Sequence, residues 1–131
     1  MGLAFLLVLL GLGCLFLAYR EQEPFQEIKV KGEALQKLVV QETVSQEADP
    51  MERTIDFAAL QRINPEIVGW LYVPQIGVDS PILTGQTDTE YLTKDFEGAY
   101  SPLGSIFTFA GARLSDSQVY LFAHNMASGQ M

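Results

Sequence analysis

The chain has 131 residues, which is enough for one modest domain. Its 16 acidic residues outnumber its 8 lysines and arginines, and the formal net charge is −8 at pH 7. That excess leaves no basic patch to neutralise phosphates, so the composition excludes nucleic acid as a partner. Cys14 is the only cysteine, so an intrachain disulfide is excluded as well.

The N-terminal segment is apolar on all sides. The 17 residues from Leu3 to Tyr19 include no charged side chain. As a helix they would extend roughly 25 Å, near the lower limit for a membrane span. We predict that residues 1–19 form a transmembrane anchor or signal segment, with a buried helix or lipidation at Cys14 as alternatives. A thiolate is strongly disfavoured in hydrocarbon, so the chain as given has no catalytic cysteine.

The segment 20–53 is rich in Glu, Gln and Lys. A weak helical spacing of apolar residues runs through it and is interrupted by Gly32; its members are Ile28, Leu35, Leu38 and Val39. This pattern predicts a polar, solvated helical stalk or linker, and a partner-binding helix is the alternative.

The pattern changes again in residues 54–131. Thr54 or Asp56 can cap a short helix that places Phe57, Leu60 and Ile63 on one face and ends at Asn64-Pro65. Short runs of β-branched and aromatic residues then predict four strands, at 69–74, 77–85, 104–109 and 118–124. A helical turn within 89–96 separates the second strand from the third. The predicted class is mainly β with N-terminal helices.

The last predicted strand ends at His124, the only histidine of the chain, just before a polar turn that begins at Asn125. A lone histidine at a strand end is most often an ordinary turn or surface residue. Four strands are few for a closed barrel, and an open edge of this kind invites aggregation. We therefore expect the sequence to be a fragment of a longer protein.

Five motifs resemble one family in order and in spacing: NPEIVGWLYVP (64–74), VDSPIL (78–83), EYLTKDFEG (90–98), SPLGSIF (101–107) and AHNMASGQM (123–131). Together they resemble the N-terminal half of the class B sortases, the membrane-anchored cysteine transpeptidases of Gram-positive bacteria. The resemblance implies an incomplete sortase-like β-barrel with about four of eight strands, whose catalytic domain is truncated at residue 131.

The resemblance also implies the site residues. His124 would be the catalytic histidine, and Leu92, Phe122 and Asn125 would contact substrate. Phe122 and Ala123 stand where the family has Tyr and Gly, which removes a hydroxyl and restricts the backbone beside the imidazole. The family's catalytic Cys and Arg have no counterpart here, so the chain as given is expected to be inactive.

The implied reaction needs no cofactor. A cysteine thiolate attacks the sorting-signal peptide of a surface protein, and the histidine protonates the departing amine. The Arg would stabilise the oxyanion or fix the peptide. An amine of a cell-wall precursor or a pilin then resolves the thioester. The expected location is the cell membrane, through residues 3–19 in a single pass, with the catalytic domain outside the cell.

Two other functions stay open at this stage. A chymotrypsin-like serine protease also has a strand that ends in Ala-His, but it would need an Asp and a Gly-flanked Ser downstream. A membrane-tethered β module without catalysis is the non-enzymatic alternative. No metal site is predicted, because Asp116 and His124 are the nearest plausible ligand pair and two ligands do not make a zinc site.

Four acidic residues of the β region are interpreted as turn and helix-cap residues rather than general bases; they are Asp79, Asp88, Asp95 and Glu97. Trp70 is expected in the core.

Overall fold

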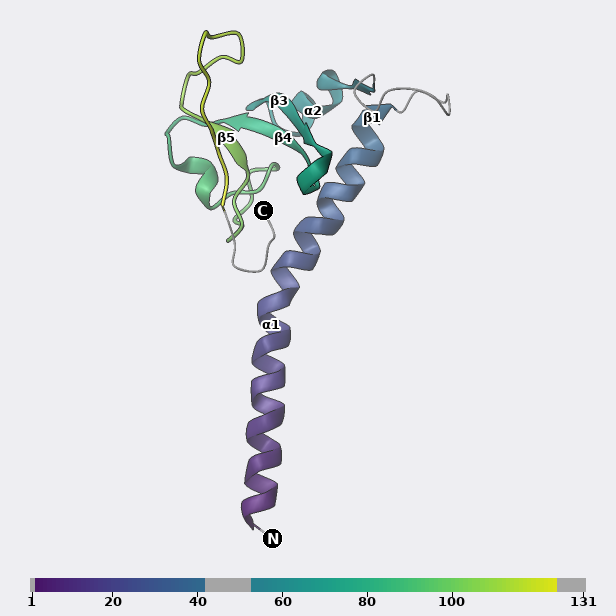
Figure 1. Cartoon of the computed structure of the whole chain (residues 1–131), viewed down its shortest axis with the longest axis vertical. Coiled ribbons are helices and arrows are strands. Elements are labelled where there is room, and N and C mark those ends of the chain that lie inside the picture. The colour runs from purple at the N-terminus through teal and green to yellow at the C-terminus, as the bar shows by residue number, and fades with distance from the viewer. Residues whose placement is uncertain (1, 42–52, 125–131) are drawn as a thin grey trace.

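The computed structural model describes residues 2–41 and 53–124. Helix α1 (Gly2–Val39) is one continuous helix, and the rest of the chain gathers around its C-terminal end (Figure 1). It continues through Gly32 without a break, although this glycine interrupts the weak apolar spacing of the segment. A single glycine costs a helix only about 1 kcal/mol, which packing of the neighbouring turns can offset. Within the described residues, no helix meets the length and apolarity needed to cross a membrane, so the predicted span stays unconfirmed.

The last turns of α1 belong to the core of the β domain. Leu35 is 5% exposed and Val39 is fully buried. They pack in one cluster with Leu60, Ile67, Leu83, Tyr91 and Phe107. The sequence predicted a solvated helix here, whereas these two side chains are core residues and Leu38 between them is exposed. The helix therefore docks on the domain through one face of its C-terminal turns.

A small two-stranded sheet follows α1 and was not predicted. Strand β1 (Val40–Gln41) pairs antiparallel with β2 (Thr54–Ile55). Helix α2 (Phe57–Ile63) comes next, and Asp56 is its N-cap: the carboxylate oxygen Oδ1 accepts a hydrogen bond of 2.8 Å from the Ala59 amide. Its Leu60 is fully buried, whereas Phe57 is exposed. The predicted helix is confirmed, and Asp56 rather than Thr54 caps it.

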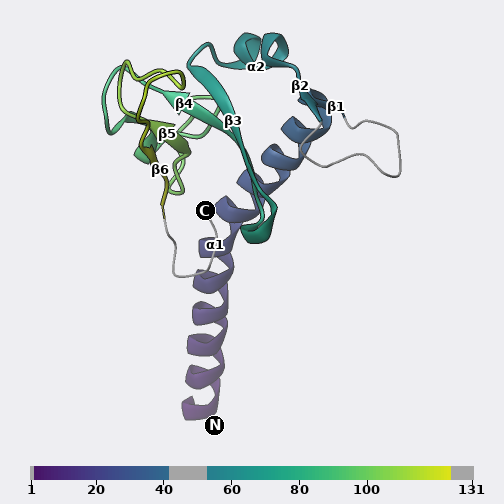
Figure 2. The same ribbon diagram turned by 45° about the horizontal axis from the view of Figure 1, so that its top comes forward.

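The main sheet has four strands in the order β3-β4-β5-β6. They are β3 (Ile67–Val73), β4 (Val78–Thr84), β5 (Ile106–Thr108) and β6 (Leu121–Phe122). The first pair is an antiparallel hairpin, β4 and β5 are parallel, and β5 and β6 are antiparallel. The sheet is open in the described residues, and Figure 2 shows β5 and β6 at the side away from α1. The predicted class, a mainly β domain with N-terminal helices, is confirmed.

Two connections shape the sheet. The 3-10 turn η2 (Pro74–Ile76) closes the hairpin, and Gly77 follows it with a φ of 71°, a left-handed conformation that suits glycine. The parallel pairing of β4 with β5 needs a long connection, which contains the 3-10 turn η3 (Glu90–Leu92). This confirms a helical turn within residues 89–96. The fourth strand is shorter than predicted, because only Leu121 and Phe122 pair with β5.

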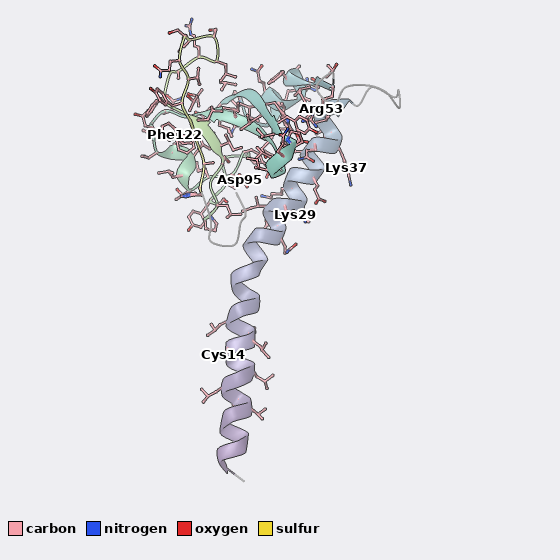
Figure 3. All side chains as sticks on the ribbon, in the orientation of Figure 1. Cys14, Lys29, Lys37, Arg53, Asp95 and Phe122 are labelled. Atoms are coloured by element: carbon pink, nitrogen blue, oxygen red, sulfur yellow. The ribbon has the colours of Figure 1, made fainter. Side chains whose placement is uncertain are left out.

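Asp79 is neither a turn nor a cap residue, which corrects the sequence interpretation. It lies in β4, where its Oδ2 accepts a hydrogen bond of 2.9 Å from Arg53 Nη1 and its Oδ1 accepts one of 2.6 Å from Trp70 Nε1. Its backbone carbonyl accepts a hydrogen bond of 2.7 Å from Gln36 Nε2 on α1. Trp70 itself is half-buried against the core. These bonds hold the β3–β4 hairpin against the helix, beside the labelled Arg53 (Figure 3).

Candidate functional site

His124 lies two residues beyond β6 and is half-buried. Its ring nitrogen Nε2 is 2.7 Å from the backbone carbonyl oxygen of Leu92. A carbonyl can only accept, so Nε2 must carry the proton and donate this bond. In the neutral ring the proton is then absent from Nδ1, which is left as the basic nitrogen. The fold therefore fixes both the orientation of the imidazole and its tautomer.

The imidazole borders a small cavity of about 70 Å³. Its lining combines apolar side chains with two serines, and the residues are Ser80, Pro81, Phe96, Leu103, Ser105, Ile106, Ala123 and His124. They come from β4, β5, the long β4–β5 connection and the segment after β6. The sheet and the connection thus meet at His124, and a partly apolar recess lies beside its ring.

The acceptor carbonyl is held by the turn that carries it. The Leu92 amide donates to the Thr89 carbonyl over 3.2 Å, and the Ser105 amide donates to the Tyr91 carbonyl over 2.9 Å. Gly104 lies against the same stretch: a Cβ at this position would lie 2.7 Å from the Leu92 carbonyl oxygen, and its φ is 61°. Only glycine fits such an approach in the left-handed region, so Gly104 is part of what places the Leu92 carbonyl.

A buried polar network lies beneath η3. The Tyr91 hydroxyl donates a hydrogen bond of 2.5 Å to Glu66 Oε2 and accepts one of 2.9 Å from Asn64 Nδ2. Asn64 Nδ2 also donates to the Phe96 carbonyl over 2.9 Å. Burial raises the pKa of Tyr91, and the hydrogen bond to Glu66 raises it further. Tyr91 therefore stays neutral and anchors the turn that presents Leu92.

The structure describes three of the four predicted site residues. Leu92 meets His124 through its backbone, while its half-buried side chain packs against the core. Phe122 stacks on Phe107 at a ring-centroid distance of 5.6 Å and is 36% exposed. Asn125 lies outside the described residues. The substrate contacts assigned to Leu92, Phe122 and Asn125 stay predictions.

Three other acidic residues accept bonds from backbone amides. Asp95 Oδ1 accepts from the amides of Glu97 and Ala99 over 3.0 and 2.9 Å, which confirms its interpretation as a turn residue. Asp116 Oδ2 accepts a hydrogen bond of 2.9 Å from the Arg113 amide within an exposed turn. Asp88 Oδ1 accepts one of 2.8 Å from the Ala110 amide, 22 positions away, so this bond joins two loops.

Sequence reasoning missed the Leu92 carbonyl as the partner of the imidazole. A backbone acceptor has no residue-type signature, because every residue carries one.

Comparisons with known proteins agree on one family. Sortase B of Staphylococcus aureus is 32% identical over 77 residues, which are 57% of this chain and 32% of the relative. The chain therefore spans about a third of that relative's length. No family model matches the sequence.

Solved structures give the same result. Sortase B from Bacillus anthracis in complex with AAEK1 superposes with a TM-score of 0.65 at 25% identity, covering 81% of this chain and 50% of that chain. A sortase B complexed with triglycine superposes with a TM-score of 0.53 at 32% identity, covering 57% and 36%. The chain thus has a partial sortase-like fold, and its resemblance to the N-terminal portion of class B sortases is confirmed.

Proposed function

We propose that this chain is part of a sortase-type cysteine transpeptidase in which His124 is the acid–base residue. The observation that carries the proposal is the bond from His124 Nε2 to the Leu92 carbonyl, 2.7 Å long, in a fold similar to part of sortase B. This bond suits a histidine that transfers protons, because one nitrogen is held while the other can react.

The proposed proton path follows from this geometry. Nδ1 is the basic nitrogen, so it would take a proton from the attacking thiol and give it to the departing amine of the peptide. During that cycle Nε2 keeps its proton and its bond to Leu92. The carbonyl dipole would also stabilise the imidazolium, since a hydrogen bond to a charged donor is stronger than one between neutral groups.

The nucleophile of this reaction is not Cys14. That residue is exposed on the N-terminal half of α1, below the β domain (Figure 3). We therefore assign the acid–base part of the site to His124 and the Leu92 carbonyl. The catalytic cysteine and an arginine would come from polypeptide outside this chain. The cysteine would attack the peptide carbonyl and expel the amine to form a thioester, which a second amine would then break.

The substrates are proposed from the same family likeness. The acylated partner would be the sorting-signal peptide of a surface protein. The acceptor would be the amine of a cell-wall precursor or a pilin. The sortase B complexed with triglycine favours an acceptor whose amine is carried by a glycine-like residue.

We also propose that the N-terminal half of α1 attaches the domain to the cell membrane, with the domain outside the cell. Exposed apolar side chains support this, for example Leu15 at 68% and Phe16 at 62%. Large exposed apolar surfaces mark contacts with a membrane or a partner. Protease treatment of intact cells should remove an epitope placed on the β domain. Protection until lysis would contradict the orientation.

The test of the catalytic proposal uses the protein expressed from its complete reading frame and a fluorogenic sorting peptide. His124→Ala should lower turnover by about 10² to 10⁴, the usual contribution of general acid–base catalysis. Asp116→Ala is the control, since Asp116 only caps an exposed turn. Turnover of His124→Ala near the wild-type rate, or a reading frame without a suitable cysteine, would refute the proposal.

A further inference from the structure

One ion pair joins α1 to the connection that carries Leu92. Lys31 Nζ donates to Asp95 Oδ2 over 3.1 Å and is 3.1 Å from Glu97 Oε2. The Asp95 side chain is only 5% exposed, whereas that of Lys31 is 31% exposed. These residues are 64 positions apart in the chain, so the pair is a long-range contact between the helix and the β4–β5 connection. Figure 3 labels Asp95 on the part of the β domain beside the helix.

Asp95 organises the turn that follows Leu92. Its Oδ1 accepts from the amides of Glu97 and Ala99, and its own amide donates to the Ala99 carbonyl over 2.8 Å. The segment is closed next to Leu92 by a backbone hydrogen bond, which the Ser101 amide donates to the Thr93 carbonyl over 2.9 Å. The Asp95 turn therefore adds a further support to the stretch that carries the Leu92 carbonyl.

The buried carboxylate makes this turn dependent on Lys31. Removing one partner of a buried ion pair leaves an uncompensated charge, which is strongly unfavourable. Without Lys31, Asp95 Oδ2 would lose its cationic partner, and opening the turn would let the carboxylate reach water. The nearby carboxylate of Glu97 would add repulsion. The hydrogen bond to Asp95 is the main cause that raises the pKa of Lys31, to about 12, so the ammonium stays charged near neutral pH.

We propose that Lys31 is a positioning residue for His124, acting through the Asp95 turn and the Leu92 carbonyl. The docked end of α1 would then be part of the acid–base site as well as an attachment. This inference rests on the proposed function only where it takes the His124 ring to be catalytic. The coupling between Lys31 and the tautomer of the imidazole does not depend on that function. The rival explanation is that the ion pair merely stabilises the packing of α1.

Nuclear magnetic resonance can separate these explanations, because His124 is the only histidine of the 131-residue chain. The chain is produced without a histidine tag, labelled with ¹⁵N and studied at a pH where the imidazole is neutral. The wild type should show one tautomer, with the proton on Nε2. Lys31→Met should give a mixture of both tautomers, and the Nε2 proton should exchange with water about tenfold faster, as expected for loss of one hydrogen bond.

Lys29→Met is the matched control, since Lys29 is exposed on the same helix two residues earlier. It should leave the tautomer unchanged, and Lys31→Arg should preserve it. A Lys31→Met chain that melts earlier but keeps the single Nε2 tautomer and the wild-type exchange rate would overturn the inference. If Lys31→Met fails to fold, Lys31→Gln is compared in the same way. An inactive parent enzyme would refute the proposed function and leave this result unaffected.

Discussion

Replacing Tyr91 by phenylalanine tests whether the polar network beneath η3 stabilises the domain. The substitution removes only the hydroxyl, which donates to Glu66 and accepts from Asn64, and it leaves the buried ring in place. Only one oxygen atom is lost, so the effect reports mainly the hydrogen bonds. Asn64 keeps its bond to the Phe96 carbonyl, and the half-buried Glu66 can regain water.

The magnitude follows from the charge of the acceptor. A hydrogen bond to a charged group contributes about 1.5–3 kcal/mol. Because Glu66 is partly hydrated after the substitution, we expect Tyr91→Phe to lower the free energy of unfolding by about 2 kcal/mol. For a domain of this size, that corresponds to a Tm lower by roughly 10 °C.

Urea unfolding followed by the fluorescence of Trp70, the only tryptophan, measures this change. Tyr100→Phe is the control, because Tyr100 is 80% exposed and the same atom is removed from a solvated position. That control should stay within about 0.5 kcal/mol of the wild type. Two variants of equal stability would refute the reasoning, since the buried hydroxyl would then contribute nothing.

Two further predictions concern the surroundings of Leu92. Gly104→Ala should destabilise the domain and shift the imidazole resonances of His124, because its Cβ would lie 2.5 Å from the Tyr91 carbonyl oxygen. Gly111→Ala shares a positive φ but meets no atom within 4 Å and lies outside the Asp95 turn, so it should leave His124 unchanged. Spectra in which both variants match the wild type would contradict this placement. Lys31 has an unfolded pKa of 10.5 and a folded pKa of about 12, so its stabilisation is fully present below pH 10.5 and is lost as pH rises through 12. In urea titrations across that range, stability should fall more steeply for the wild type than for Lys31→Met, and parallel curves would exclude the effect.

The sequence predicted the elements that depend on local signals. Period-two runs of β-branched and aromatic residues gave the four strands of the main sheet, and Asp56 marked the start of α2. Short-range chemistry is sufficient there, because a cap or an alternating strand needs only its neighbours. The strand before His124 was predicted too long, since its pairing is limited by the length of its partner β5, which a local pattern does not reveal.

The contacts that assemble the site were not predictable in this way. The burial of Leu35 and Val39 depends on which surface α1 meets. The weak apolar spacing of the segment 20–53 left a partner-binding helix as the alternative but did not indicate which surface that helix would contact. The pairing of Lys31 with Asp95 depends on the same docking. His124 could be singled out as the only imidazole, whereas its acceptor could not, because a carbonyl is common to all residues.

The spacing of these contacts along the chain has a consequence for the order of folding. The β3–β4 hairpin joins neighbouring segments and can form early, because closing a short loop costs little entropy. His124 and Leu92 are 32 positions apart, and Lys31 and Asp95 are 64 apart. We expect the imidazole to reach its acceptor late, after the hairpin has docked on α1. Partial unfolding of the same contacts would release the ring while the hairpin persists, so hydrogen exchange should show protection at residues 69–82 outlasting that at the Ser105 amide.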